Sequence, residues 1–148
     1  MYLQQANLTV GVGRDFVKEL TDISVKETYE EGHFLFRKGD QASYTYLLLT
    51  GRVQLRFGET GQVVHIVSRP GETFGWSTLV GRDFYSATAE CVMPTKLRKL
   101  YKQDFEKLLE KDPANGLIFF QRLARMLGER LLVSYGGYEK MIARETYV

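Results

Sequence analysis

The sequence predicts a mainly β protein: an antiparallel β-barrel of jelly-roll type (a double-stranded β-helix), with a short helix before it and helices after it. Short β-rich runs recur between residues 22 and 101, and glycine-bearing turns separate them. Strands this short and this evenly spaced favour an antiparallel sandwich or barrel over a parallel sheet with crossover helices. The runs are SVKETY, HFLFR, YTYLLLT, RVQLRF, QVVHIV, YSATAEC and TKLRKLY.

A short helix is predicted before the strands, because Phe16, Val17 and Leu20 have helical spacing. Residues 1–13 are interpreted as a lead-in to this helix. Between two of the β-rich runs, GETGQ has the glycines of a hairpin turn. The chain of 148 residues suits a single domain, which we place at 14–140.

Two helices are predicted after the strands. QDFEKLLEK (103–111) carries apolar residues at helical spacing. Asp112-Pro113 is a typical helix start, because aspartate caps free N–H groups and proline suits the first helical position. The second helix is expected to run from about 113 to 135 and to end near Gly136-Gly137, with a tail over 141–148.

The apolar stripe of this second helix includes Leu123, Leu127 and Leu131 and is wider than one face packed on a small barrel needs. Two interpretations stay open. The stripe is a single wide core face, or the helix packs on the barrel and also pairs with its twin in a homodimer.

Composition excludes several classes of protein. The net charge of +2 is too small to argue for a nucleic-acid partner. The first residues lack the pattern of a secretory signal, and no apolar run approaches the roughly 18 residues of a membrane span. We therefore expect a cytoplasmic protein without a membrane partner. The single Cys91 forms no intramolecular disulfide and is expected to be buried.

The sequence carries no recognisable catalytic or metal-binding pattern. His33 and His65 are its two histidines, and they do not form an H-x-H pair. His65 lies in an alternating run, where a half-exposed strand histidine is expected. Nucleophile-elbow, P-loop and dinucleotide-binding motifs are also missing. We predict a non-enzymatic protein without catalytic residues, metal or cofactor, and keep a metal-dependent enzyme of the cupin type as a remote alternative.

The most unusual segment is PGETFGWSTLVGRDFYSATAEC, at 70–91. It combines glycines, small hydroxyl residues and the single tryptophan, Trp76. A glycine-rich turn followed by a short helical turn directs backbone N–H groups toward one point, an arrangement that favours an anion. The same composition also suits an ordinary loop with turn glycines.

These segments together resemble the cyclic nucleotide-binding domains of the catabolite activator protein and of the regulatory subunit of cyclic-AMP-dependent protein kinase. EEGHFLFRKGD resembles the paired-glycine turn of that family, and YLLLTGRVQL resembles the next strand pair. PGETFG resembles the start of the phosphate-binding cassette, and DFEKLL resembles the helix after the barrel. The helix from 113 resembles the family helix that closes the pocket and forms the dimer. The resemblance covers about residues 14–140.

The cassette departs from the family pattern F-G-E-x-A-L, loop, R-[AS]-A-[TS] at two positions. Trp76 stands where the family glutamate accepts a hydrogen bond from the ribose 2′-hydroxyl, and Tyr85 where the family arginine pairs with the cyclic phosphate. Losing two such contacts, each contributing about 1.5–3 kcal/mol, weakens binding roughly 10²- to 10⁴-fold. The resemblance implies a ligand site at Phe74, Gly75, Trp76, Ser77, Thr78, Tyr85, Ser86 and Ala87.

We therefore interpret the chain as a regulatory sensor domain that binds cyclic AMP or cyclic GMP weakly, or binds a different small ligand. The alternative is a ligand-free interaction or dimerisation domain in which Trp76 and Tyr85 plug the pocket. Arg82, three residues before Tyr85, is a candidate replacement for the missing arginine. Ser134 and Tyr135 are candidates for contact with a base. No helix-turn-helix is expected after the long helix, so no nucleic acid is expected to bind through this chain.

Overall fold

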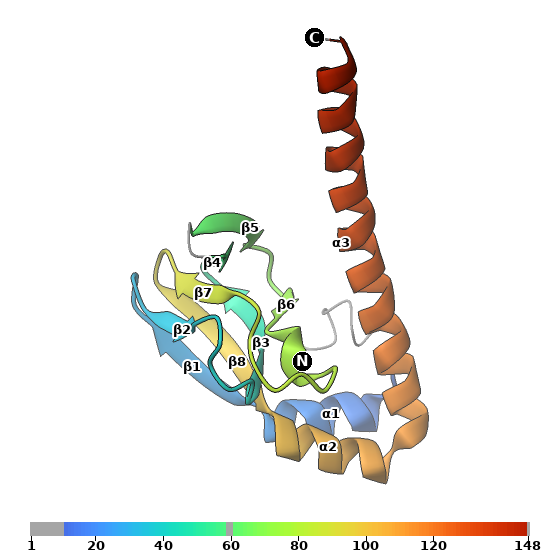
Figure 1. Ribbon diagram of the computed structural model, residues 1–148. Helices are drawn as coiled ribbons and strands as arrows, with labels where there is room; N and C mark the ends of the chain where they lie inside the picture. The colour runs from blue at the N-terminus through green and yellow to red at the C-terminus, as the bar shows by residue number, and fades with distance from the viewer. Residues whose placement is uncertain (1–10, 59–60, 148) are drawn as a thin grey trace.

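The computed structural model describes residues 11–58 and 61–147. Its elements alternate short strands with turns and place helices at both ends (Figure 1). The helices are α1 (Arg14–Ile23), α2 (Lys102–Lys111) and α3 (Pro113–Tyr147), with a 3₁₀ turn, η3 (Trp76–Thr78). The strands are β1 (Val25–Tyr29), β2 (Phe34–Phe36), β3 (Tyr44–Thr50), β4 (Val53–Phe57), β5 (Gln62–Val67), β6 (Thr73–Phe74), β7 (Thr88–Cys91) and β8 (Thr95–Tyr101).

The strands form two antiparallel sheets, ordered β1-β8-β3-β6 and β2-β7-β4-β5. This is the strand order of a jelly roll, so the predicted fold class is confirmed. One buried cluster draws side chains from both sheets, including Leu48 of β3, Val53 of β4 and Cys91 of β7. The alternation of the sequence thus places one face of each strand in a shared core.

A second core lies between the sheets and the helices. Phe16 and Leu20 of α1 meet Phe105 of α2 and Leu123 of α3 there, and all four side chains are buried. Figure 1 shows α1 and α2 side by side below the sheets, with the first turns of α3 beside them. The apolar faces of α1 and α2 and the first half of the α3 stripe, with Leu123 and Leu127, are therefore packed in this core, whereas Leu131 is 50% exposed.

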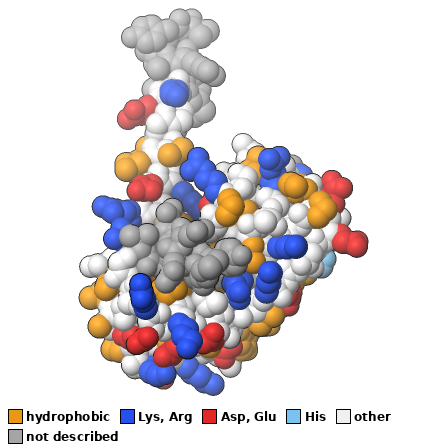
Figure 2. All heavy atoms as spheres, turned by 180° about the vertical axis from the view of Figure 1, so that it is seen from behind, with side chains coloured by type: hydrophobic (Ala, Val, Ile, Leu, Met, Phe, Trp, Pro, Cys, Tyr) orange, Lys and Arg blue, Asp and Glu red, His pale blue; other side chains and the backbone are white. Residues whose placement is uncertain are grey.

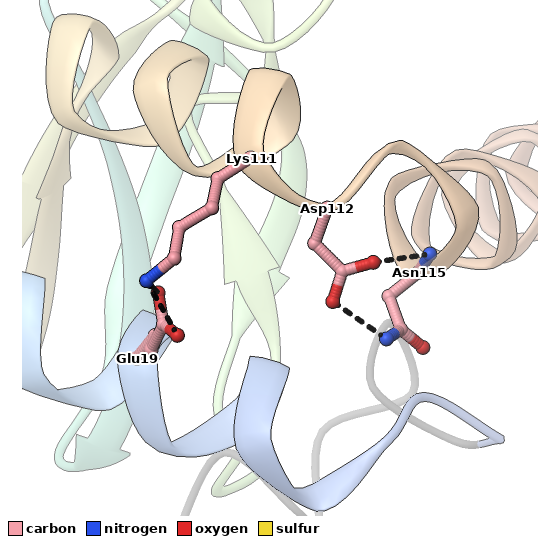
Figure 3. Close-up of polar contacts among 4 residues, drawn as sticks. All are labelled: Glu19, Lys111, Asp112 and Asn115. Carbon is pink, nitrogen blue, oxygen red and sulfur yellow. Dashed lines mark hydrogen bonds and ion pairs between the residues drawn. The ribbon is translucent and has the colours of Figure 1, made fainter.

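The corner between α2 and α3 is held by polar contacts (Figure 3). Lys111, at the end of α2, pairs with Glu19 of α1 at 3.0 Å. Asp112 accepts hydrogen bonds from the backbone N–H of Asn115 at 3.2 Å and from its side-chain amide at 2.8 Å. The predicted helix start at Asp112-Pro113 is confirmed, because the carboxylate satisfies a backbone N–H group of the first turn.

The end of α3 differs from the prediction. The helix does not stop near Gly136-Gly137 but continues to Tyr147, through the segment interpreted as a tail. Neither glycine adopts the positive φ of a helix C-cap. A glycine inside a helix costs only about 1 kcal/mol relative to alanine, so two of them weaken a helix without ending it. As a result α3 projects well beyond the sheets (Figure 1).

The hairpin at GETGQ is confirmed by the pairing of Phe57 with Gln62, although residues 59 and 60 lie outside the described residues, as do residues 1–10 of the lead-in. Cys91 is buried, as expected. Strand β6 was not predicted, because two residues are too short for a periodic pattern. In the described part of the chain, no helix is long and apolar enough to cross a membrane.

Candidate functional site

The cassette begins at a tight turn between β6 and η3. Gly75 has φ +72, and a Cβ built there would lie 3.2 Å from Cδ2 of Tyr46 and 3.3 Å from the carbonyl oxygen of Tyr44. A side chain is therefore disfavoured both by the backbone conformation and by lack of space. The predicted short helical turn follows at once as η3.

Tyr85 is packed into the core of the domain. Its side chain is 5% exposed and its ring stacks on Phe36, with the ring centroids 3.8 Å apart. Its hydroxyl accepts a hydrogen bond from the backbone N–H of Tyr44 at 3.0 Å and donates one to the carbonyl oxygen of the same residue. Burial raises the pKa of the Tyr85 phenol, which stays neutral at physiological pH. The position of the family arginine is thus filled by a neutral core side chain.

Neighbouring cassette side chains are also engaged within the protein. The hydroxyl of Thr78 donates to the carbonyl oxygen of Tyr44 at 3.0 Å. Trp76 packs against the core between sheets and helices, and Phe74 and Ser77 are buried. Ser86 and Ala87 are partly exposed, whereas Arg82 is exposed on the loop. A ligand-binding role for these eight predicted residues stays a prediction.

An open groove lies between the start of the cassette and α3. Its volume is about 480 Å³, within the range of small-molecule sites. One wall comes from β5, β6 and the turn that joins them, and the other from α3. The lining residues are Val64, His65, Arg69, Pro70, Gly71, Glu72, Thr73, Met126, Glu129, Arg130, Val133 and Ser134. A depression of about 590 Å³ beside Phe84 touches α2 instead of α3.

Charged side chains concentrate in the groove. Arg130 of α3 is partly buried, and one of its guanidinium nitrogens donates to the carbonyl oxygen of Thr73 at 3.3 Å. Burial lowers the pKa of this guanidinium and the Glu72 carboxylate opposes the effect, so Arg130 remains charged. Nε2 of His65 lies 3.2 Å from a carboxylate oxygen of Glu72. Arg69 is exposed at the turn.

The predicted ligand contacts of the cassette and of α3 therefore lie in different places in the structure. Of the residues predicted to contact a ligand or base, Ser134 lines the groove, whereas the eight cassette residues do not. Arg69, Glu72 and Arg130 were missed as site residues. A signal for Arg130 was present, because it lies one helical turn before Ser134.

Two facing sheets in jelly-roll order, a glycine-started cassette and a long helix across a groove define a sensor domain of the cyclic nucleotide-binding type. The model of the cyclic nucleotide-binding domain family matches residues 26–112. The chain belongs to this family. Domains of this family are regulatory domains. Among the described residues, no group of three or more potential metal ligands occurs.

Similar proteins include regulators with additional domains. The chain is 29% identical to the cyclic AMP receptor protein of Thermus thermophilus over 109 residues, covering 72% of this chain and 48% of that protein. It is 22% identical to the cGMP-dependent protein kinase egl-4 of Caenorhabditis elegans, covering 73% of this chain and 14% of that kinase. The chain thus spans about half the length of the first of these relatives and a smaller part of the second.

Solved structures show the same fold. The crystal structure of the Thermus thermophilus catabolite activator protein superposes with a TM-score of 0.75 at 26% identity, covering 92% of this chain and 63% of that one. The sensor domain of the transcriptional regulator DNR from Pseudomonas aeruginosa has a TM-score of 0.70 at 24% identity, covering 88% and 89%.

Proposed function

We propose that this chain is a non-enzymatic regulatory domain that senses a small ligand in the groove between the start of the cassette and α3. The observation that carries this proposal is the hydrogen bond from Arg130 to the carbonyl oxygen of Thr73, which joins the two walls of the groove. A ligand seated there contacts both walls. Its binding free energy can therefore shift the position of α3 against the sheets.

Cyclic AMP and cyclic GMP are expected to bind weakly. Trp76 cannot accept a hydrogen bond from a ribose hydroxyl, and the neutral Tyr85 is held in the core by Tyr44. Relative to a cassette with both family side chains, affinity is expected to fall roughly 10²- to 10⁴-fold. Arg82, whose side chain is exposed on the loop, stays the predicted candidate to replace the family arginine.

The output of the domain is expected to pass through α3. Among the described residues of α3 after Arg130, Leu131, Leu132 and Tyr135 form an exposed apolar set, whereas the exposed Val133 lines the groove. Figure 2 shows hydrophobic side chains on the stretch of α3 that leaves the body. Leu123 and Leu127 instead pack in the helical core. We propose that the exposed set pairs two copies of α3 in a homodimer, in a protein located in the cytoplasm.

A second candidate function is a ligand-free interaction domain. It is favoured by the packing of Tyr85 on Phe36, which fills the cassette position where a phosphate would pair. The open groove beside α3 favours the sensor instead, because a plugged domain does not need a cavity of about 480 Å³ there.

The test combines calorimetric titration with hydrogen exchange of α3. Cyclic AMP, cyclic GMP and a panel of organic anions are titrated to about millimolar concentration, beside a family member whose cassette keeps both side chains. We expect weak nucleotide binding and changed exchange at 126–134 for whichever ligand binds. Micromolar nucleotide affinity would overturn the expected loss of contacts. Absence of binding and of any exchange change across the panel would overturn the sensor function in favour of the interaction domain.

A further inference from the structure

The groove contains a feature that the cassette lacks, a pair of guanidinium groups on opposite walls. Arg69 belongs to the turn between β5 and β6, and Arg130 belongs to α3. Figure 2 shows Lys and Arg side chains where α3 leaves the body of the domain. The planar donor forks of arginine suit the oxygens of carboxylate, sulfonate or phosphate groups.

We propose that the anion-binding pole of this domain lies at Arg130 and Arg69, and that the groove takes an organic monoanion with an apolar body. This inference deepens the proposed sensor function. The effect of the bound anion on α3 rests on that function, whereas the binding of the anion does not. The positive charge that the cassette lacks at Tyr85 is supplied here from the helix and from the β5–β6 turn.

Arg130 has donors to offer a ligand. A guanidinium carries five N–H donors, and among the described residues Arg130 makes one hydrogen bond, through Nη2 to Thr73. The side chain is partly buried, so its attraction for an anion is screened less by water than that of an exposed arginine. The bond to Thr73 also orients the guanidinium toward the β6 wall.

The acidic residues of the groove limit the ligand to a single negative charge. The Glu72 carboxylate lies 3.2 Å from Nε2 of His65 and also attracts the Arg130 guanidinium, whose pKa it raises against the effect of burial. Glu129 lines the groove from α3 and is exposed. Two guanidiniums and two carboxylates give the lining no net charge, so one anionic group can be held locally at Arg130 and Arg69, while further negative charge on the ligand would be repelled by the carboxylates.

The apolar residues that line the groove are the reason to expect a ligand with an apolar body. Val64 of β5 and Val133 of α3 are 56% and 76% exposed, and Met126 lies on the same wall as Val133. A ring system placed between these side chains removes exposed apolar surface from water, which favours binding. The volume of about 480 Å³ accommodates a molecule of two to three rings.

The test uses two fluorescent probes that differ by one charge. The anion 8-anilinonaphthalene-1-sulfonate and its uncharged counterpart N-phenyl-1-naphthylamine are titrated into the wild type, Arg130→Gln, Arg69→Gln and the control Arg125→Gln. Arg125 is an exposed arginine of α3 outside the groove lining. Amide NMR shifts with the sulfonate locate the bound probe, and circular dichroism confirms that each variant folds.

We expect the sulfonate to shift amides at 71–73 and 126–134. Arg130→Gln should weaken its binding at least about ten-fold and Arg69→Gln to a smaller degree, since the first guanidinium is partly buried. Arg125→Gln should change the affinity less than two-fold, and the uncharged probe should be insensitive to all three changes.

The inference is overturned by equal effects of Arg130→Gln and Arg125→Gln, by equal affinity for the two probes, or by shifts outside the groove. If Arg130→Gln were to unfold the protein, the affinity of Arg69→Gln for the sulfonate, compared with that of Arg125→Gln, tests the inference. Failure here combined with nucleotide-dependent exchange at α3 would leave the sensor function standing. If the sulfonate bound in the groove without changing hydrogen exchange in α3, the anion site would be supported and the sensor function would be contradicted.

Discussion

The guanidinium of Arg130 and the carbonyl oxygen of Thr73 lie 3.3 Å apart and join the long helix to the strand that leads into the cassette. The contact connects residues 57 positions apart in the sequence. Because Thr73 directly precedes Phe74 and Gly75, a displacement of α3 at this level changes the restraint on the start of the cassette. This pair is the physical link between ligand site and output in our account.

Replacing Arg130 with methionine should loosen this link. The change keeps an unbranched apolar stem but removes the donor, so we expect faster amide exchange at β6 and at 127–134 of α3. The free energy of unfolding should fall by about 1 kcal/mol, the usual contribution of one hydrogen bond. Arg125→Met is the matched control on the exposed side of α3. Equal exchange profiles for the two variants would show that the contact does not restrain the helix.

The cassette turn should depend on glycine at position 75. Both Gly75 and Gly81 have positive φ, but a Cβ at Gly81 has no neighbour within 4 Å, whereas one at Gly75 crowds Tyr46 and Tyr44. Gly81→Ala should therefore cost about 1 kcal/mol of stability from the backbone alone, and Gly75→Ala about 1–2 kcal/mol more. Urea unfolding of the two variants measures the difference. Similar losses would mean that Gly75 is not crowded.

The hydroxyl of Tyr85 should stabilise the fold. In Tyr85→Phe the backbone N–H of Tyr44 loses its acceptor, while its carbonyl oxygen keeps the hydroxyl of Thr78 as a donor. We expect a loss of about 1–2 kcal/mol in the free energy of unfolding. Ser68→Ala, which removes a hydroxyl at an exposed position, should leave stability unchanged. If Tyr85→Phe left the free energy of unfolding unchanged, the phenol would not be anchored to β3.

Alkaline pH should destabilise the protein through its buried phenols. Burial raises the pKa of Tyr46 above its ordinary value of 10.0. The folded state thus keeps a proton that the unfolded chain releases, so the stabilising contribution is complete below about pH 10 and is lost as the pH rises further. Each such group contributes a slope of up to about 1.4 kcal/mol per pH unit.

Tyr46→Phe should reduce this slope. Unfolding free energies of the variant and the wild type are compared between about pH 8 and 11.5 in the same denaturant series. Burial also raises the pKa of Tyr85 and Cys91, so the variant should retain part of the dependence. A slope that does not change on removing the Tyr46 hydroxyl would show that this phenol titrates alike in both states.

The exposed stretch of α3 should control the oligomeric state. Leu132 is 67% exposed, and a charge there opposes burial in a helix pair. Light scattering after size exclusion should show a dimer for the wild type and a monomer for Leu132→Glu. Val25→Glu, which changes a 52% exposed residue of β1, should remain dimeric. A wild-type monomer at high concentration would contradict pairing through α3.

The sequence predicted the fold where local patterns repeat. Seven of the strands and all three helices follow from alternation, helical spacing and the Asp112-Pro113 start. Strand β6 was not predicted, because two residues are too few to show a periodic pattern. It is a strand because it pairs with β3. The end of α3 was misplaced because Gly136-Gly137 has the composition of a helix stop, while the intrinsic cost of glycine is too small to enforce one.

The candidate site was predicted less well, for a physical reason. The resemblance placed Tyr85 beside a ligand, but only tertiary contacts reveal that its hydroxyl is taken up by Tyr44. Arg69 and Arg130 line the same groove although they are 61 positions apart in the sequence, which no local pattern encodes. Their proximity depends on how α3 returns along the β5–β6 turn.

An amide NMR titration with cyclic AMP distinguishes a ligand in the groove beside α3 from a ligand at Tyr85. Our account predicts shifts at 71–73 and at 126–134 of α3, with saturation only near about millimolar nucleotide. Shifts confined to the cassette at 75–88 with micromolar affinity would contradict it, because the ligand would then bind at Tyr85 without engaging α3. Absence of shifts at every concentration of cyclic AMP and of the organic anions would contradict it as well.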